Sequence, residues 1–112
     1  MEDDVFSFLK LGDYYYYGIG HERNFETAMQ YYNLVVQAQR NNTFTAQAAY
    51  NLAYMCLHGE GHPINETRSD LYFQVALEIL ENMNILNYPL LQLIGFYQKE
   101  ALFEKVSEYF QV

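Results

Sequence analysis

The chain has 112 residues, enough for one small domain or for two to three helical repeats. Its formal net charge of −8, from 14 acidic and 6 basic residues, argues against nucleic acid or an anionic membrane surface as the main partner. Twelve tyrosines and eight phenylalanines without tryptophan predict a core built from aromatic rings, and the few prolines and glycines argue against a linker or a disordered chain.

Three sequence features bear on the compartment in which the chain works. Cys56 is the single cysteine, so no intramolecular disulfide is possible, and its place inside a predicted helix indicates a buried structural thiol. No apolar run reaches the roughly 18 residues of a transmembrane helix. Residues 2–4 are acidic where a signal peptide would be basic, so in a secretory compartment we expect this sequence to be a piece of a longer protein.

The chain repeats one stretch, because residues 11–21 return as residues 52–62 at a constant offset of 41 residues. Such an offset is typical of a repeat array. The matched pairs are Leu11 and Leu52, Gly18 and Gly59, Gly20 and Gly61, His21 and His62, Asn24 and Asn65, and Tyr31 and Tyr72. Each unit therefore predicts a helix, a Gly-x-Gly turn and a second helix.

The glycines and asparagines of this pattern have physical roles in the predicted turn. Gly18 and Gly59 stand where the end of a helix requires a positive φ, which glycine adopts without a Cβ clash. Asn24 and Asn65 stand four residues after the second glycine, where an asparagine side chain accepts a hydrogen bond from an unpaired amide and caps the next helix.

The first unit predicts helices over residues 5–17 and 25–39. The face of the first helix that should pack on the second carries Phe8, Leu11, Gly12 and Tyr15. Gly12 is small enough for close approach, and a larger side chain there should overpack by about 1–3 kcal/mol. The apolar stripe of the second helix is Phe25, Ala28, Tyr32 and Val35.

The second unit follows a polar break at residues 40–43 and predicts helices over residues 44–58 and 66–82. The apolar residues of its second helix are Leu71, Val75, Leu77, Ile79 and Leu80. A third helix is expected to start near Pro89 and a last one to cover residues 100–110. This end is strongly apolar where a terminal cap is usually polar, so residues 86–110 are expected to fold back as a cap or to self-associate or bind a partner.

The outward face of the first helix of each unit is the candidate partner-binding surface, since tyrosine and methionine on such a face suit binding. The candidate residues are Asp13, Tyr14, Tyr17, Tyr54, Met55 and His58. Packing against the next repeat is an equally good explanation of the same residues, and the two interpretations stay open.

The pattern Leu-Gly-x-x-Tyr-x-x-Gly-x-Gly, followed by a capping asparagine and by alanine and paired tyrosines, resembles the Sel-1-like repeat. The matches in the first unit are Leu11, Gly12, Tyr15, Gly18, Gly20, Asn24, Ala28, Tyr31 and Tyr32, and those in the second are Leu52, Gly59, Gly61, Asn65, Tyr72, Phe73 and Ala76. Departures from the pattern are Ala53, Cys56, Ser69, His21 and His62. The resemblance implies an all-α, right-handed α-solenoid of tetratricopeptide-related helix-turn-helix repeats. It would be a single domain over residues 1–112, with repeats at 5–40 and 44–82 and irregular C-terminal helices at 86–110.

A narrower resemblance is carried by the tyrosine run at 14–17, residues 25–28, residues 46–52 and the apolar segment 88–97. These stretches look like the last repeats of the lumenal Sel-1-like adaptors of the ER-associated degradation (ERAD) ubiquitin ligase. That resemblance implies a non-catalytic scaffold in the endoplasmic reticulum lumen, within a longer membrane-anchored protein. Its partners would be lumenal segments of the membrane ligase, and lectins or misfolded glycoproteins. The alternative is a generic Sel-1-like signalling scaffold in the cytosol or a bacterial periplasm.

Two glycosylation sequons fit a lumenal setting, one at Asn41 and one at Asn65. Asn65 has a competing role as a helix cap, so Asn41 in the polar break is the better acceptor.

No constellation for enzyme chemistry is legible in the sequence, so we predict no catalytic residues and no cofactor. No Ser-His-Asp or Cys-His arrangement is evident, and Gly18-Ile19-Gly20 follows a helix where a phosphate loop would follow a strand. His21 and His62 are interpreted as loop histidines and not as metal ligands, because equivalent positions of stacked helices lie about 10 Å apart.

Overall fold

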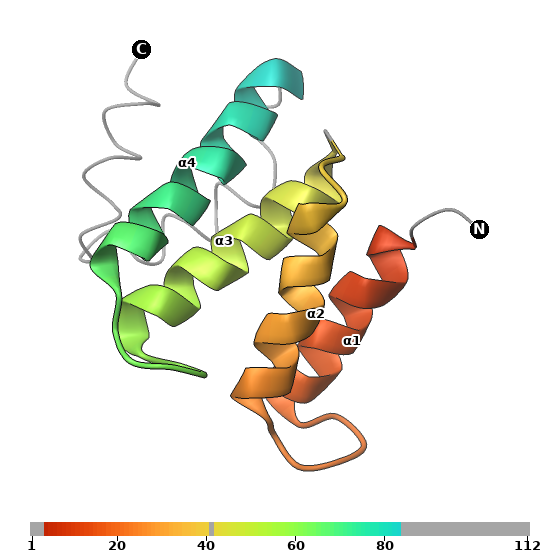
Figure 1. Cartoon of the computed structure of the whole chain (residues 1–112). Coiled ribbons are helices and arrows are strands. Elements are labelled where there is room, and N and C mark those ends of the chain that lie inside the picture. Colours follow the sequence, from red (N-terminus) through yellow and green to blue (C-terminus); the bar gives the residue numbers. More distant parts are fainter. Residues whose placement is uncertain (1–3, 41, 84–112) are drawn as a thin grey trace.

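The structure, a computed structural model, describes residues 4–40 and 42–83. The described chain contains the helices α1 (Val5–Tyr17), α2 (Phe25–Gln37), α3 (Thr43–His58) and α4 (Glu66–Met83), and no strand. α1 pairs with α2 and α3 pairs with α4 as two helical hairpins that lie side by side (Figure 1). The predicted all-α fold of repeated hairpins is therefore confirmed, while the C-terminal helices predicted over residues 86–110 lie outside the described residues.

Each helix begins with a side-chain oxygen that accepts a hydrogen bond from the backbone N–H three residues later. The pairs are Asp4 with Ser7 at 3.0 Å, Asn24 with Thr27 at 3.0 Å, Asn42 with Thr45 at 2.9 Å, and Asn65 with Arg68 at 3.0 Å. The predicted caps Asn24 and Asn65 are confirmed. Asn42 was not predicted as a cap, and it begins α3 at Thr43 instead of residue 44.

The two Gly-x-Gly turns have the same backbone geometry. Gly18 and Gly59 both have φ of 72°, in the left-handed region that was predicted for them. At the end of each turn, the backbone N–H of the capping asparagine donates to a carbonyl of the preceding helix. The N–H of Asn24 donates to the Tyr15 carbonyl and the N–H of Asn65 to the Cys56 carbonyl, each at 2.8 Å. The turn thus fixes where the second helix of each hairpin starts.

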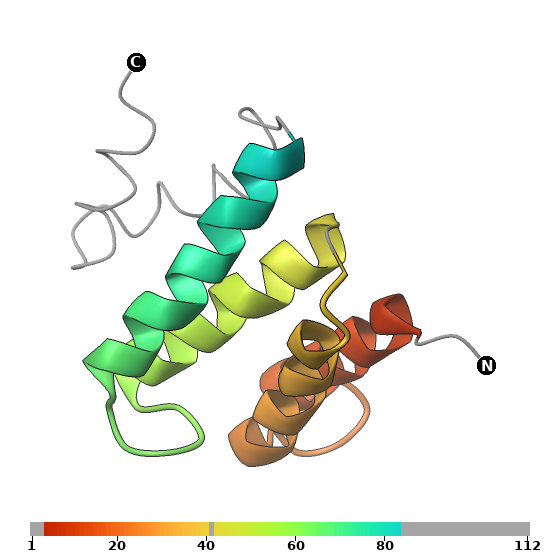
Figure 2. The ribbon, with the colours of Figure 1, turned by 45° about the horizontal axis from the view of Figure 1, so that its top comes forward.

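The core forms on both sides of α3, which lies between α4 and the first hairpin (Figure 2). One side of α3 packs on α4 and the other packs on α1 and α2. The α3 residues facing α4 are Ala46, Ala49, Tyr50 and Ala53, and those facing the first hairpin are Ala48, Leu52 and Met55. α3 is therefore buried over most of its circumference, and Cys56 on it is fully buried as predicted.

The apolar stripes of the second helices are largely as predicted, with one error. Ala28, Tyr32 and Val35 of α2 are buried, but Leu71 of α4 is 62% exposed. Leu71 lies in the first two turns of α4, on the side that faces away from α3, while Phe73 and Ala76 fill the core in its place. No helix of residues 4–40 and 42–83 is long and apolar enough to cross a membrane.

Candidate partner-binding groove

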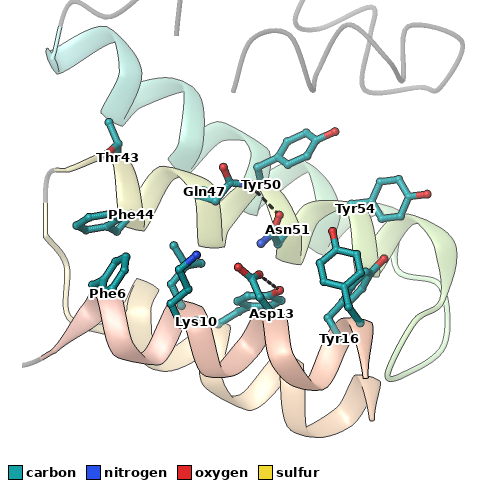
Figure 3. Close-up of a pocket in the computed structure, with 13 residues that line it drawn as sticks. Phe6, Lys10, Asp13, Tyr16, Thr43, Phe44, Gln47, Tyr50, Asn51 and Tyr54 are labelled. Carbon is teal, nitrogen blue, oxygen red and sulfur yellow. Dashed lines mark hydrogen bonds between the residues drawn. The ribbon is translucent and has the colours of Figure 1, made fainter. Parts of the chain in front are cut away.

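A groove of about 320 Å³ lies between α1 and α3 (Figure 3). Its lining consists of Phe6, Leu9, Lys10, Asp13, Tyr16 and Tyr17 from α1, Tyr32 from α2, and Thr43, Phe44, Gln47, Tyr50, Asn51 and Tyr54 from α3. Eight of these residues form four repeat-equivalent pairs at the 41-residue offset, namely Phe6 and Gln47, Leu9 and Tyr50, Lys10 and Asn51, and Asp13 and Tyr54. The groove is therefore built by the same face of the first helix in each hairpin.

One end of the groove is apolar. The rings of Phe6 and Phe44 contact each other there in a tilted arrangement at a centroid distance of 5.3 Å, and both side chains remain partly exposed, at 47% and 38% (Figure 3). Lys10 lies next to this pair, with its Nζ 5.6 Å from the centre of the Phe6 ring, a distance that permits a cation–π contact. An apolar side chain of a partner would find two aromatic faces here.

The middle of the groove holds a partly buried carboxylate. Tyr32, itself buried, donates its hydroxyl to Oδ1 of Asp13 at 2.6 Å. Burial raises the pKa of Asp13, and the Tyr32 hydrogen bond and the positive charge of Lys10 oppose that shift. A desolvated carboxylate of this kind gains from any further cation that approaches it.

The other end of the groove is rich in tyrosine. Tyr16 and Tyr54 stand there (Figure 3), and Tyr17 packs edge-on against Tyr16 at a ring-centroid distance of 4.8 Å. The Tyr16 hydroxyl donates to Oε1 of Glu60 at 2.7 Å, which joins the first hairpin to the turn of the second. Burial is the main cause that raises the pKa of Tyr16 above its ordinary value, and the hydrogen bond to the Glu60 carboxylate is the next largest cause. This end therefore combines aromatic faces with a second carboxylate.

An amide pair on α3 lies between the two ends. The side-chain amide of Gln47 donates to the Asn51 oxygen at 3.1 Å, one helical turn away. This bond leaves the Gln47 oxygen as an acceptor and the Asn51 amide as a donor for further hydrogen bonds. Such a pair suits the carbonyl and N–H groups of an extended backbone.

Three of the six predicted partner-binding residues line the groove, namely Asp13, Tyr17 and Tyr54. Tyr14 is 43% exposed but lies outside the lining, and the exposed His58 stacks on Tyr54 at 4.1 Å. Which of these residues contact a partner remains a prediction.

Met55 was placed on the partner-binding surface, and this is wrong. Its exposure is 0%, because it packs in the core between α3 and the first hairpin. Met55 is the repeat equivalent of Tyr14, so its position in the second repeat is the one that stacks on the preceding hairpin. Of the two interpretations left open by the sequence, packing between repeats is therefore the correct one for Met55.

The sequence analysis did not single out Phe6 and Phe44 as candidate site residues. Phe6 was left off the faces assigned to the first helix, and Phe44 was the expected first residue of its helix. The signal that would have found the groove is the helical spacing of residues 6, 10, 13 and 17, which places them on one face, with residues 47, 51 and 54 at the equivalent positions of the second unit.

The two loop histidines each bond inside their own turn. Nδ1 of His21 donates to the Glu22 carbonyl at 2.9 Å, and Nδ1 of His62 donates to the Pro63 carbonyl at 2.6 Å. Among residues 4–40 and 42–83, no group of three or more His, Cys, Asp or Glu side chains is arranged to hold a metal ion.

Each of these histidines also packs on the end of the helix before it, at equivalent positions. The His21 ring lies 4.2 Å from the Tyr15 ring, and Nε2 of His62 lies 3.7 Å from Sγ of Cys56. The second contact is a Cys-His pair that the sequence analysis missed. Because His62 Nδ1 carries the proton that it donates to Pro63, His62 Nε2 accepts a hydrogen bond from the Cys56 thiol. Burial raises the pKa of Cys56, which favours the thiol over the reactive thiolate, so the pair has a structural role.

The two sequons differ in what the structure says about them. Asn41 lies outside the described residues. Asn65 is exposed, but its side-chain oxygen caps α4 through the Arg68 amide. Glycosylation at either asparagine remains a prediction.

Comparison with known proteins gives a consistent picture. The family model described as Sel1 repeat matches residues 9–34 and 46–78. Protein sel-1 homolog 2 of Homo sapiens is 39% identical over 61 residues, which cover 54% of this chain and 8% of that protein. The ERAD-associated E3 ubiquitin-protein ligase component HRD3B of Arabidopsis thaliana is 43% identical over 70 residues, which cover 62% of this chain and 11% of that protein. The matched region is thus a small fraction of either relative, and no solved structure matches the chain significantly.

Proposed function

The chain belongs to the Sel1 repeat family, and from this premise we propose that it is a non-catalytic scaffold for protein–protein interaction, acting as an adaptor in the ubiquitin-ligase machinery of ERAD. The observation that carries the binding role is the groove between α1 and α3, because it offers partly exposed aromatic rings and polar groups together. Aromatic side chains contribute most at the centres of protein interfaces.

The choice of ERAD over other settings rests on similarity to the Arabidopsis thaliana ligase components HRD3B and HRD3A, at 43% and 40% identity over 70 residues each. On this proposal the chain works in the lumen of the endoplasmic reticulum, as part of a longer membrane-anchored protein. Its partner is a lumenal segment of the membrane ubiquitin ligase.

The alternative is a Sel1 repeat scaffold with a partner outside ERAD, in the cytosol or a periplasm. The similarity to protein sel-1 homolog 2 favours retaining it, because that name states no part in degradation. Both alternatives use the same groove and differ in what fills it.

Affinity capture separates the two. The immobilised chain is exposed to detergent-solubilised membranes of the endoplasmic reticulum, and retained proteins are identified by mass spectrometry. We expect the membrane ubiquitin ligase to be retained, and to be lost when Tyr17 and Tyr54 are both changed to Ala. The Leu71→Ala variant is the matched control, since Leu71 is exposed on α4 and outside the groove. Absence of the ligase from the wild-type capture would refute the ERAD assignment.

A further inference from the structure

The charges around the groove favour a basic ligand. Asp13 lies within the lining and Glu60 is hydrogen-bonded to a lining tyrosine, while Lys10 is the only cationic side chain among the described lining residues. Lys10 lies over the Phe6 ring at the apolar end. The whole chain carries a net charge of −8, which draws cationic partners toward it.

The tyrosines give that basic group a second attraction. A guanidinium or ammonium on the side of Asp13 away from Lys10 would also approach Tyr16 and Tyr54, which lie at that end of the groove (Figure 3). Cation–π contacts and charge-assisted hydrogen bonds strengthen as water is excluded, and Asp13 is partly buried already.

The distance between the two ends determines the spacing of the ligand's side chains. Phe6 and Asp13 are seven residues apart on α1, which at about 1.5 Å per residue is a separation of roughly 10 Å. A polyproline-II segment rises about 3.1 Å per residue and returns to the same face every three residues, so positions i and i+3 are about 9 Å apart on one side. The groove volume of about 320 Å³ suits such a short motif and is too small for a folded domain.

Resting on the scaffold role proposed above, we propose that the groove recognises an extended segment of a partner protein with an apolar and a basic residue three positions apart. The apolar side chain packs on the exposed surface of the Phe6–Phe44 pair, and the lysine or arginine meets Asp13 among the tyrosines. The amide groups of Gln47 and Asn51 bond the backbone of the segment between them.

Peptide titration followed by ¹⁵N NMR of the full chain tests this proposal. The probes are capped ten-residue Gly/Ser peptides that contain Leu-x-x-Arg, Leu-x-x-Glu or Leu-x-Arg. We expect the first peptide to shift resonances of α1 and α3, and to bind at least about fivefold more tightly than the other two. Equal binding of the Glu peptide, or shifts confined to α2 and α4, would overturn the proposal.

Three variants make the test specific. Asp13→Asn keeps an acceptor for Tyr32 but removes the charge, so it should weaken the Arg peptide at least about fivefold. Glu78→Gln removes one negative charge from an exposed site on α4 and should change binding less than about twofold. Lys10→Gln removes the competing cation, so it should strengthen binding, a gain that misfolding cannot produce.

Failure of this inference is distinguishable from failure of the proposed function. If ligase capture persists and depends on Tyr17 and Tyr54 while Asp13→Asn binds the Arg peptide as well as wild type does, the scaffold role stands and the basic motif is refuted. If the Arg peptide binds as predicted but no ligase is captured, the motif stands and the ERAD assignment falls.

Discussion

The close approach of α2 to Gly12 of α1 allows a quantitative prediction for Gly12→Ala. A Cβ built at Gly12 would lie 2.4 Å from Cε1 and 2.6 Å from Cδ1 of Tyr32, well below any normal contact. Tyr32 is 1% exposed and its hydroxyl is bonded to Asp13, so any movement of its ring disturbs the core packing or that hydrogen bond. The added methyl must therefore displace either the ring or the backbone of α1.

Two opposing effects set the size of the change. Alanine is a better helix former than glycine by about 1 kcal/mol, which favours the variant. Overpacking costs about 1–3 kcal/mol, and weakening the Tyr32–Asp13 hydrogen bond adds about 1 kcal/mol. Because the unfavourable effects are larger, we expect Gly12→Ala to lower the free energy of unfolding by about 2 kcal/mol.

Urea unfolding followed by circular dichroism, in a double-mutant cycle with Tyr32→Phe, tests the mechanism. Without its hydroxyl the ring is no longer tethered, so Gly12→Ala should cost about 1 kcal/mol less in the Tyr32→Phe background. The second repeat supports this, because it has Ala53 and Phe73 at the equivalent positions, both buried in one cluster. Unchanged or increased stability of Gly12→Ala, as helix propensity alone predicts, would refute the reasoning.

Three further predictions concern the turns and caps. Gly18→Val should lower the free energy of unfolding by at least about 1–2 kcal/mol, and with it the melting temperature, because φ is 72° at this residue and a Cβ would meet the Arg23 backbone at 3.0 Å. An unchanged melting temperature would count against this turn geometry. Hydrogen bonds from Ser7 lower the pKa of Asp4 below its ordinary value of 3.8, so the cap stabilises the fold above that pH and its contribution is lost as the pH falls through the lowered pKa. Asp4→Asn should therefore flatten the acid limb of a pH–stability profile. An identical acid limb in the variant would contradict the role of the cap. Tyr16→Phe should cost about 1 kcal/mol in urea unfolding by breaking the bond to Glu60, whereas a matching loss in Tyr14→Phe, outside that bond, would argue against it.

Local structure could be predicted from the sequence because its causes lie within a few residues of one another. The positive φ of Gly18 and Gly59 and the capping by Asn24 and Asn65 each depend on one side chain or its absence, and all were predicted. The close approach at Gly12 was also predicted, since a missing side chain inside an apolar face signals a neighbouring helix.

The errors arise where burial depends on more than one neighbour. α3 packs on α4 and on the first hairpin at once, so Met55 is buried on a face that its helical spacing assigned to solvent. Leu71 is exposed for the converse reason, because no described helix covers its side of α4. Periodicity identifies an apolar face but does not say how many neighbours a repeat helix has.

The groove itself was only partly predictable. Asp13, Tyr17 and Tyr54 were placed on one surface from their repeat positions, and the structure brings them into one lining. The apolar end needed the pairing of Phe6 with Phe44, which are not repeat equivalents and meet only because the two hairpins stack with a particular offset. Contacts between repeats are thus the part that required the structure.

Site-specific photocrosslinking tests the central claim most directly. A photoreactive phenylalanine analogue replaces Phe44 in the groove or, as the control, Leu71 on α4, in the chain targeted to the endoplasmic reticulum of living cells. The account predicts that the Phe44 probe, and not the Leu71 probe, crosslinks to the membrane ubiquitin ligase. A ligase crosslink from Leu71 alone, or the absence of one from both positions, would contradict it.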